Sequence, residues 1–205
     1  MEDEENEEEK VAEIKSILIG EAGVGKTNLV KSVIDLRFEQ NSRSTVNALY
    51  VSKKMQIFGK DYELKLWDTA GQEKYRSLTK LFYKDSKVVI FVYDITNKKS
   101  FNELNYWINE IKESLGNEPV LGMVGNKYDL KDLKEVDDNT AKKFAEEKGI
   151  KFKLVSIKED PKEFKLFLRT LVKDYIIKSG GINIQDYLDL ETNRDNNNHG
   201  SCIIF

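Results

Sequence analysis

Reactive side chains are scarce in this sequence. Its 205 residues include one cysteine, one histidine and two prolines. The single cysteine, Cys202, excludes an intramolecular disulfide framework and is typical of a reducing compartment. The single histidine, His199, lies near the same end of the chain, so we do not expect imidazole or thiolate catalysis in the core. Any chemistry must then depend on the positioning of groups and on charge.

Long apolar runs are missing as well. The sequence has no run of 18 apolar residues and no basic, apolar leader. We therefore expect neither a membrane-spanning helix nor a secretory signal, and a chain that folds in the cytosol. The 40% of hydrophobic residues in a chain of this length suit one domain with a packed core.

Acidic charge is concentrated at the two ends. The net charge is -3, but residues 2–9 hold seven acids and residues 179–205 hold four acids against one base. Without these two segments, 32 basic and 25 acidic side chains remain, a net charge of about +7. We expect an acidic disordered arm over residues 1–12, a folded domain over residues 13–178 and a flexible tail over residues 179–205. An autoinhibitory or partner-docking role is the alternative for the arm.

Between the ends, strand-like and helix-like patterns alternate, which predicts an α/β fold with a mostly parallel sheet and helices on both faces. Only Phe58-Gly59-Lys60-Asp61 separates the second and third strand-like runs, so we expect one antiparallel edge strand. Ser100-x-x-Glu103 predicts a capping box that opens the third helix. The strand-like runs are Ile14–Ile19, Tyr50–Ile57, Tyr62–Trp67, Val88–Tyr93, Val120–Val124 and Phe152–Val155, and the helical ones are Lys26–Phe38, Phe101–Leu115, Thr140–Lys148 and Phe164–Lys178.

The stretch GEAGVGKT, residues 20–27, follows the first strand-like run and opens the first helical one. This is the G-x-x-x-x-G-K-[ST] pattern of a phosphate-binding loop in its expected context. Glycines let the backbone wrap closely around phosphates, while backbone N–H groups, the helix N-terminus and Lys26 supply positive charge. Thr27 is placed to offer its hydroxyl to Mg²⁺. The loop alone leaves ATPases, kinases and GTPases open.

A second motif, Asn126-Lys127-Tyr128-Asp129, follows the apolar run at residues 120–124. It stands at the carboxyl end of a predicted strand, where open α/β sheets bind ligands. The Asp129 carboxylate can accept from both N1–H and the 2-amino group of guanine. Adenine presents an acceptor at the first position and lacks the second donor. The pattern therefore predicts guanine, preferred by roughly 10⁴-fold or more.

A third motif, Asp68-Thr69-Ala70-Gly71-Gln72, also follows a strand-like run. Asp68 supplies a carboxylate for the metal shell, Gly71 a backbone N–H that can approach a γ-phosphate, and Gln72 an amide that can orient a water molecule.

These segments, in this order, resemble the Ras superfamily of small GTPases, and residues 65–79 and 91–96 are similar to stretches of its Rab branch. The resemblance covers about residues 14–178. It implies a P-loop G domain with a six-stranded, mostly parallel sheet, one antiparallel edge strand and five flanking helices. It also implies a GTP/GDP-dependent switch that hydrolyses GTP slowly with Mg²⁺ and regulates vesicle-mediated traffic.

The resemblance also assigns roles to single residues. Phe38 falls where the family packs an aromatic ring against guanine, Thr45 where the first switch ligates Mg²⁺, and Ser156-Ile157-Lys158 where a backbone N–H meets the guanine carbonyl. Gln72 is the expected catalytic residue, and the metal ligands are Thr27, Thr45 and Asp68. The expected nucleotide contacts are Gly20, Glu21, Ala22, Gly23, Val24, Gly25, Lys26, Thr27, Asn28, Phe38, Thr45, Gly71, Asn126, Lys127, Asp129, Ser156, Ile157 and Lys158.

The resemblance implies partners too: an exchange factor, a GTPase-activating protein that supplies an arginine, a prenyl-binding escort and effectors. We expect a monomer with no nucleic-acid partner. Residues 46–50 are Val-Asn-Ala-Leu-Tyr, whereas the usual segment of the family at this place resembles Ile-Gly-Val-Asp-Phe. In the family, this segment contacts partner proteins. A nucleotide-bound scaffold with little hydrolysis is the alternative function, and the base motif disfavours an ATP-dependent kinase.

The last four residues, Cys202-Ile203-Ile204-Phe205, match a prenylation signal, with the terminal Phe favouring a geranylgeranyl lipid on Cys202. A basic patch or a second lipid, which stable anchoring requires, is missing from the acidic tail. We therefore expect a cytoplasmic protein attached reversibly to the cytosolic face of an intracellular membrane.

Overall fold

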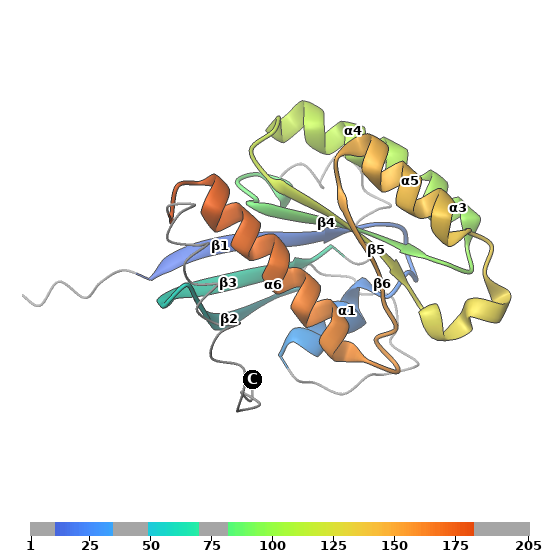
Figure 1. The fold of residues 1–205 in the computed structure, drawn as a ribbon, viewed down its shortest axis with the longest axis horizontal. Helices are drawn as coiled ribbons and strands as arrows, with labels where there is room; N and C mark the ends of the chain where they lie inside the picture. Colours follow the sequence, from blue (N-terminus) through green and yellow to red (C-terminus); the bar gives the residue numbers. More distant parts are fainter. Residues whose placement is uncertain (1–10, 35–48, 70–81, 183–205) are drawn as a thin grey trace, which may run out of the picture.

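The computed structural model describes residues 11–34, 49–69 and 82–182, and Figure 1 shows their arrangement. Within these ranges the chain forms a six-stranded sheet with helices on both faces, which confirms the predicted fold class. No helix in the three ranges combines the length and apolar character that crossing a bilayer requires.

The strand order across the sheet is β2-β3-β1-β4-β5-β6. Every neighbouring pair is parallel except β2 and β3, which are antiparallel. Phe58 (φ 53°) and Gly59 (φ 76°) form the two-residue turn between β2 and β3, and positive φ at both positions is what such a tight hairpin requires. The predicted antiparallel edge strand is confirmed, with a shorter turn than expected because β3 begins at Lys60. The strands are β1 (Ala12–Ile19), β2 (Leu49–Ile57), β3 (Lys60–Asp68), β4 (Val88–Asp94), β5 (Val120–Asn126) and β6 (Lys151–Leu154).

Two helical layers bury the sheet between them (Figure 1). Helices α1 (Lys26–Val33) and α6 (Pro161–Lys178) cover one face, and α3 (Lys98–Asn102), α4 (Leu104–Leu115) and α5 (Asp138–Lys148) cover the other. A 3-10 segment, η2 (Tyr128–Leu133), follows β5. All seven residues of β4 are buried, and its alternate side chains enter the two cores. This explains why the central strands read as continuous apolar runs rather than as alternating patterns.

The helical run predicted at residues 101–115 begins differently from the expectation. The predicted capping box at Ser100 and Glu103 is wrong, because α3 begins at Lys98 and its cap is Asn97, whose side chain accepts from the Ser100 N–H. The Ser100 hydroxyl is buried and donates to the Asn97 carbonyl (2.7 Å). Glu103 precedes α4 and makes no side-chain cap. The side-chain amide of Asn97, three residues before Ser100, therefore caps the helix in place of the predicted serine.

The sheet topology brings the predicted motifs to one edge. The chain leaves β1 for β2 and β3 on one side and then crosses to β4 and β5 on the other. The carboxyl ends of β1, β3, β4 and β5 therefore converge where the direction of winding reverses, which is the usual ligand crevice of open α/β sheets.

Candidate functional site

The phosphate-binding loop, residues 20–25, connects β1 to α1 and depends on two glycines. A Cβ on Gly20 would lie 2.1 Å from the carbonyl oxygen of Val92 in β4. Gly25 is the N-cap of α1 with φ 100°, and a Cβ there would lie 2.3 Å from Nδ2 of Asn126. The loop is thus packed against both β4 and the end of β5 in a backbone shape that side chains would disturb.

Lys26 places a positive charge inside this loop. Its side chain is buried, and Nζ donates to the carbonyl oxygens of Gly20 (2.6 Å) and Glu21 (2.9 Å). The ammonium is therefore held beside the backbone and the N-terminus of α1, where both the helix dipole and Lys26 favour an anion.

Two oxygen donors meet next to the loop. Thr27 Oγ1 donates to Oδ2 of Asp68 (2.6 Å), which joins the first turn of α1 to the end of β3. Asp68 is fully buried, and its neighbour Thr69 donates to the Leu18 carbonyl (2.6 Å), so β3 is fixed against β1 at this point. Hard oxygen donors of this kind suit Mg²⁺.

The described residues contain no cluster of three or more His, Cys, Asp or Glu side chains that could hold a metal alone. A hydroxyl and one carboxylate nevertheless fit Mg²⁺, because this ion keeps several waters and takes the remaining ligands from substrate phosphates. Thr27 and Asp68 are the residues that would hold it. Thr45, the third expected ligand, lies outside the described residues.

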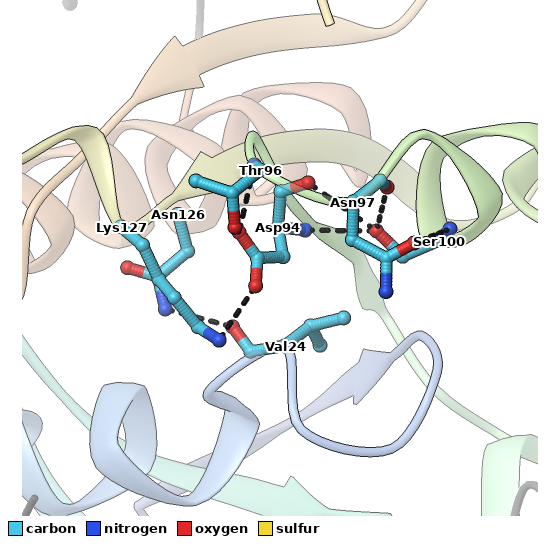
Figure 2. A network of polar contacts seen from close by, with 7 residues as sticks. All are labelled: Val24, Asp94, Thr96, Asn97, Ser100, Asn126 and Lys127. Atoms are coloured by element: carbon cyan, nitrogen blue, oxygen red, sulfur yellow. Dashed lines mark hydrogen bonds and ion pairs between the residues drawn. The ribbon is translucent and has the colours of Figure 1, made fainter. Parts of the chain in front are cut away.

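Asn126 joins the base motif to the phosphate loop. Its side chain is buried at the end of β5, and Nδ2 donates to the Val24 carbonyl (2.8 Å), as Figure 2 shows. Its Oδ1 is buried and has no hydrogen-bond partner among the described residues. An orphaned buried acceptor is costly unless a donor reaches it, so this oxygen fits a site that a ligand completes.

Asp129 and the segment 156–158, both predicted to contact the base, lie together in the structure. The Asp129 carboxylate accepts from Ser156 Oγ (2.8 Å), and Lys158 Nζ lies 3.8 Å from its second oxygen. The Ile157 side chain is buried in the core cluster beneath α1 and α6. The core therefore accommodates the isoleucine side chain at a position where the family that the sequence resembles usually has a smaller residue.

Several predicted residues cannot be placed. Phe38, Thr45, Gly71, Gln72 and Cys202 lie outside the described residues. The structure does bring together the phosphate loop, Thr27 with Asp68, Asn126 with Val24, and Asp129 with Ser156.

Sequence reasoning missed Asp94, the last residue of β4. Its Oδ2 lies 2.6 Å from Lys127 Nζ, and the side chains of both residues point toward each other in Figure 2. The available signal was an acid directly after a buried apolar run, at the same sheet edge as the other motifs.

The sequence is similar to known proteins of one family. The Ras family model matches residues 15–176. Ras-related protein YPTC6 of Chlamydomonas reinhardtii is 35% identical over 190 residues, which are 93% of this chain and 86% of that protein. Ras-related protein Rab-21 of Geodia cydonium is 41% identical over 154 residues, 75% of this chain and 67% of the relative. Rab-21 of Homo sapiens is 40% identical over 154 residues, covering 75% and 68%. The residues that the family model matches include the phosphate-binding loop, Asp68, the base motif and residues 156–158.

Proposed function

The chain belongs to the Ras superfamily of small GTPases, in its Rab-like branch, and we propose that it is a GTP/GDP-dependent switch that regulates vesicle-mediated membrane traffic. Membership of this family supports GTPase activity and the binding of guanine nucleotide and Mg²⁺ in general.

One observation carries the assignment of the site: the hydrogen bond between Asn126 Nδ2 and the Val24 carbonyl. It ties the strand that reads the base to the loop that binds phosphates, so one ligand must satisfy both. Asp129 then selects guanine through its carboxylate, and the backbone N–H groups of residues 20–25 together with Lys26 bind the phosphates.

We assign hydrolysis to positioning and electrostatics. A water oriented by Gln72 attacks the γ-phosphorus, and the bond from this phosphorus to the β–γ bridging oxygen breaks, with the bonding electron pair going to that oxygen of GDP. A proton of the water passes to the inorganic phosphate that forms. Lys26 stabilises the charge on the phosphoryl oxygens, and bound Mg²⁺ supplies further charge neutralisation there. The reaction is slow without help, and an arginine from an activating protein accelerates it by roughly 10³- to 10⁵-fold.

Switching follows from the same contacts. Thr45 and Gly71 are ordered by the third phosphate and released after hydrolysis, which partner proteins detect. An exchange factor, an activating protein, a prenyl-binding escort and effectors are the partners we propose, with a geranylgeranyl lipid on Cys202 for reversible attachment to a cytosolic membrane face.

A second candidate function is a nucleotide-bound scaffold that hydrolyses little GTP. It is favoured by the unusual sequence of residues 46–50, because proteins of this family contact their partners through the corresponding segment. Chromatography of the nucleotide in purified protein, followed by single-turnover hydrolysis, separates the two functions. We expect guanine nucleotide and turnover that Gln72→Leu abolishes, whereas the matched control Gln56→Leu, an exposed change in β2, leaves it intact. Equal turnover for wild type and Gln72→Leu would support the scaffold, and adenine nucleotide would contradict both.

A further inference from the structure

We propose that Asp94 is a positioning residue for the nucleotide: by holding the ammonium of Lys127, it fixes the base motif and slows nucleotide release. This inference rests on the proposed function, because it concerns the same site. Asp94 belongs to none of the motifs that bind phosphate, metal or base, and its side chain acts through Lys127.

The ion pair is short and partly buried. Lys127 Nζ lies 2.6 Å from Asp94 Oδ2, and the two side chains are 35% and 10% exposed. Among the described residues, Asp94 is the acid that pairs with this lysine. A shielded pair of this kind is screened less by salt than a surface pair, so it can hold the long lysine side chain in one geometry.

Asp94 is itself fixed before it meets the lysine. Its Oδ1 accepts from the backbone N–H of Thr96 (2.9 Å) and from Thr96 Oγ1 (2.7 Å). Its own backbone N–H donates to Ser100 Oγ (3.1 Å), which in turn donates to the Asn97 carbonyl (2.7 Å). Figure 2 shows these contacts, together with the Asp94–Lys127 ion pair and the separate hydrogen bond from Asn126 to Val24 of the phosphate loop. One carboxylate oxygen is thus used locally, and the other is directed at Lys127.

The backbone explains why the lysine needs to be held. Lys127 adopts φ 66°, a left-handed conformation that is unfavourable for a residue with a side chain. It stands between Asn126, which clamps the phosphate loop, and Asp129, which we assign to guanine. Asp94 is the register partner of Asn126, and the Ile95 N–H donates to the Asn126 carbonyl (3.2 Å). The ion pair therefore stabilises the strained turn that orients both base-site residues.

Asp94→Asn removes the charge and keeps the shape. The amide oxygen can still accept from Thr96, which directs the amide NH₂ toward the lysine ammonium, where two donors repel each other. We expect GDP and GTP to leave roughly 10-fold faster, the effect of losing one charge-assisted hydrogen bond. The two rates should rise equally, because the pair lies at the base motif rather than at the third phosphate.

The test measures release of a fluorescent GDP analogue, with excess Mg²⁺, from wild type, Asp94→Asn, Lys127→Met and the double variant. If Asp94 acts through Lys127, Asp94→Asn accelerates release in the wild type and adds nothing in the Lys127→Met background. Ile111→Val, a buried change in α4, is the control for stability: it lowers the melting temperature and leaves release unchanged.

Unchanged release from Asp94→Asn, or a double variant whose acceleration is the product of the two single ones, would overturn the positioning role. Should Asp94→Asn fail to fold, Thr96→Val decides instead, because it keeps the carboxylate and removes one of its hydrogen bonds. It should release GDP roughly 2- to 5-fold faster, and release at the wild-type rate would contradict the proposal. A wild-type protein that retains no guanine nucleotide would instead refute the proposed function itself.

Discussion

Gly25→Ala is the substitution that most sharply tests how the phosphate loop is joined to the base motif. Gly25 has φ 100°, and the added methyl group would lie 2.3 Å from Asn126 Nδ2. Asn126 must then move away, and its hydrogen bond to the Val24 carbonyl breaks inside the protein. Two costs combine: left-handed backbone at a non-glycine residue and a buried amide without its partner.

The magnitudes follow from these two causes. The backbone strain costs about 1–2 kcal/mol, and leaving a buried polar group unsatisfied costs about 1–3 kcal/mol. We expect Gly25→Ala to lower the free energy of unfolding by about 2–5 kcal/mol, a large part of the roughly 5–15 kcal/mol of a typical domain.

Gly23→Ala is the matched comparison in the same loop. Gly23 also has a positive φ (79°), but a Cβ there would meet nothing within 4 Å, so only the strain applies. Denaturant unfolding of both variants, with nucleotide removed by chelating Mg²⁺, should differ by about 1–3 kcal/mol, the cost of the lost Asn126 contact. Equal stability of the two variants would refute the inferred link between Asn126 and the loop.

Three further predictions concern the metal, a buried phenol and the tail. Thr27→Val should weaken Mg²⁺ binding roughly 10- to 100-fold. Nucleotide release from this variant should then no longer slow when Mg²⁺ is added. Burial, with Glu110 nearby, raises the pKa of Tyr83 to about 12, so the neutral phenol stabilises the fold below pH 10 and this contribution is lost as pH rises through 12. The absorbance titration of the wild type minus that of Tyr83→Phe should therefore have its midpoint near pH 12. A midpoint near pH 10, the ordinary value for tyrosine, would contradict this prediction. Cys202→Ser should move the protein from membranes to the soluble fraction on fractionation, and unchanged membrane association would exclude the lipid.

The sheet and its edge strand could be predicted from sequence because local patterns determine them. Apolar runs of strand length mark the buried strands, and the short gap after Ile57 leaves room only for a hairpin. The phosphate loop and the base motif could be found for a related reason: each is contiguous, and each directly follows a strand.

The remaining features depend on contacts between distant segments or on competition between neighbouring caps. The pairing of Asp94 with Lys127 joins β4 to the turn after β5, and the local sequence around either residue does not predict that it contacts the other. Ser100 had the spacing of a capping residue, but Asn97 caps the helix first. The burial of Ile157 is decided by the core beneath α1 and α6, which its own triplet does not reveal.

The central claim, that one site reads guanine through Asp129 and phosphate through the loop at residues 20–25, is tested most directly by competition. Fluorescent GDP bound to the wild-type protein is challenged with GTP and with ATP, each with Mg²⁺. The account predicts that GTP displaces it at concentrations roughly 10⁴-fold or more below those of ATP, and that Asp129→Ala removes most of this difference. Displacement by ATP and GTP at similar concentrations would contradict it.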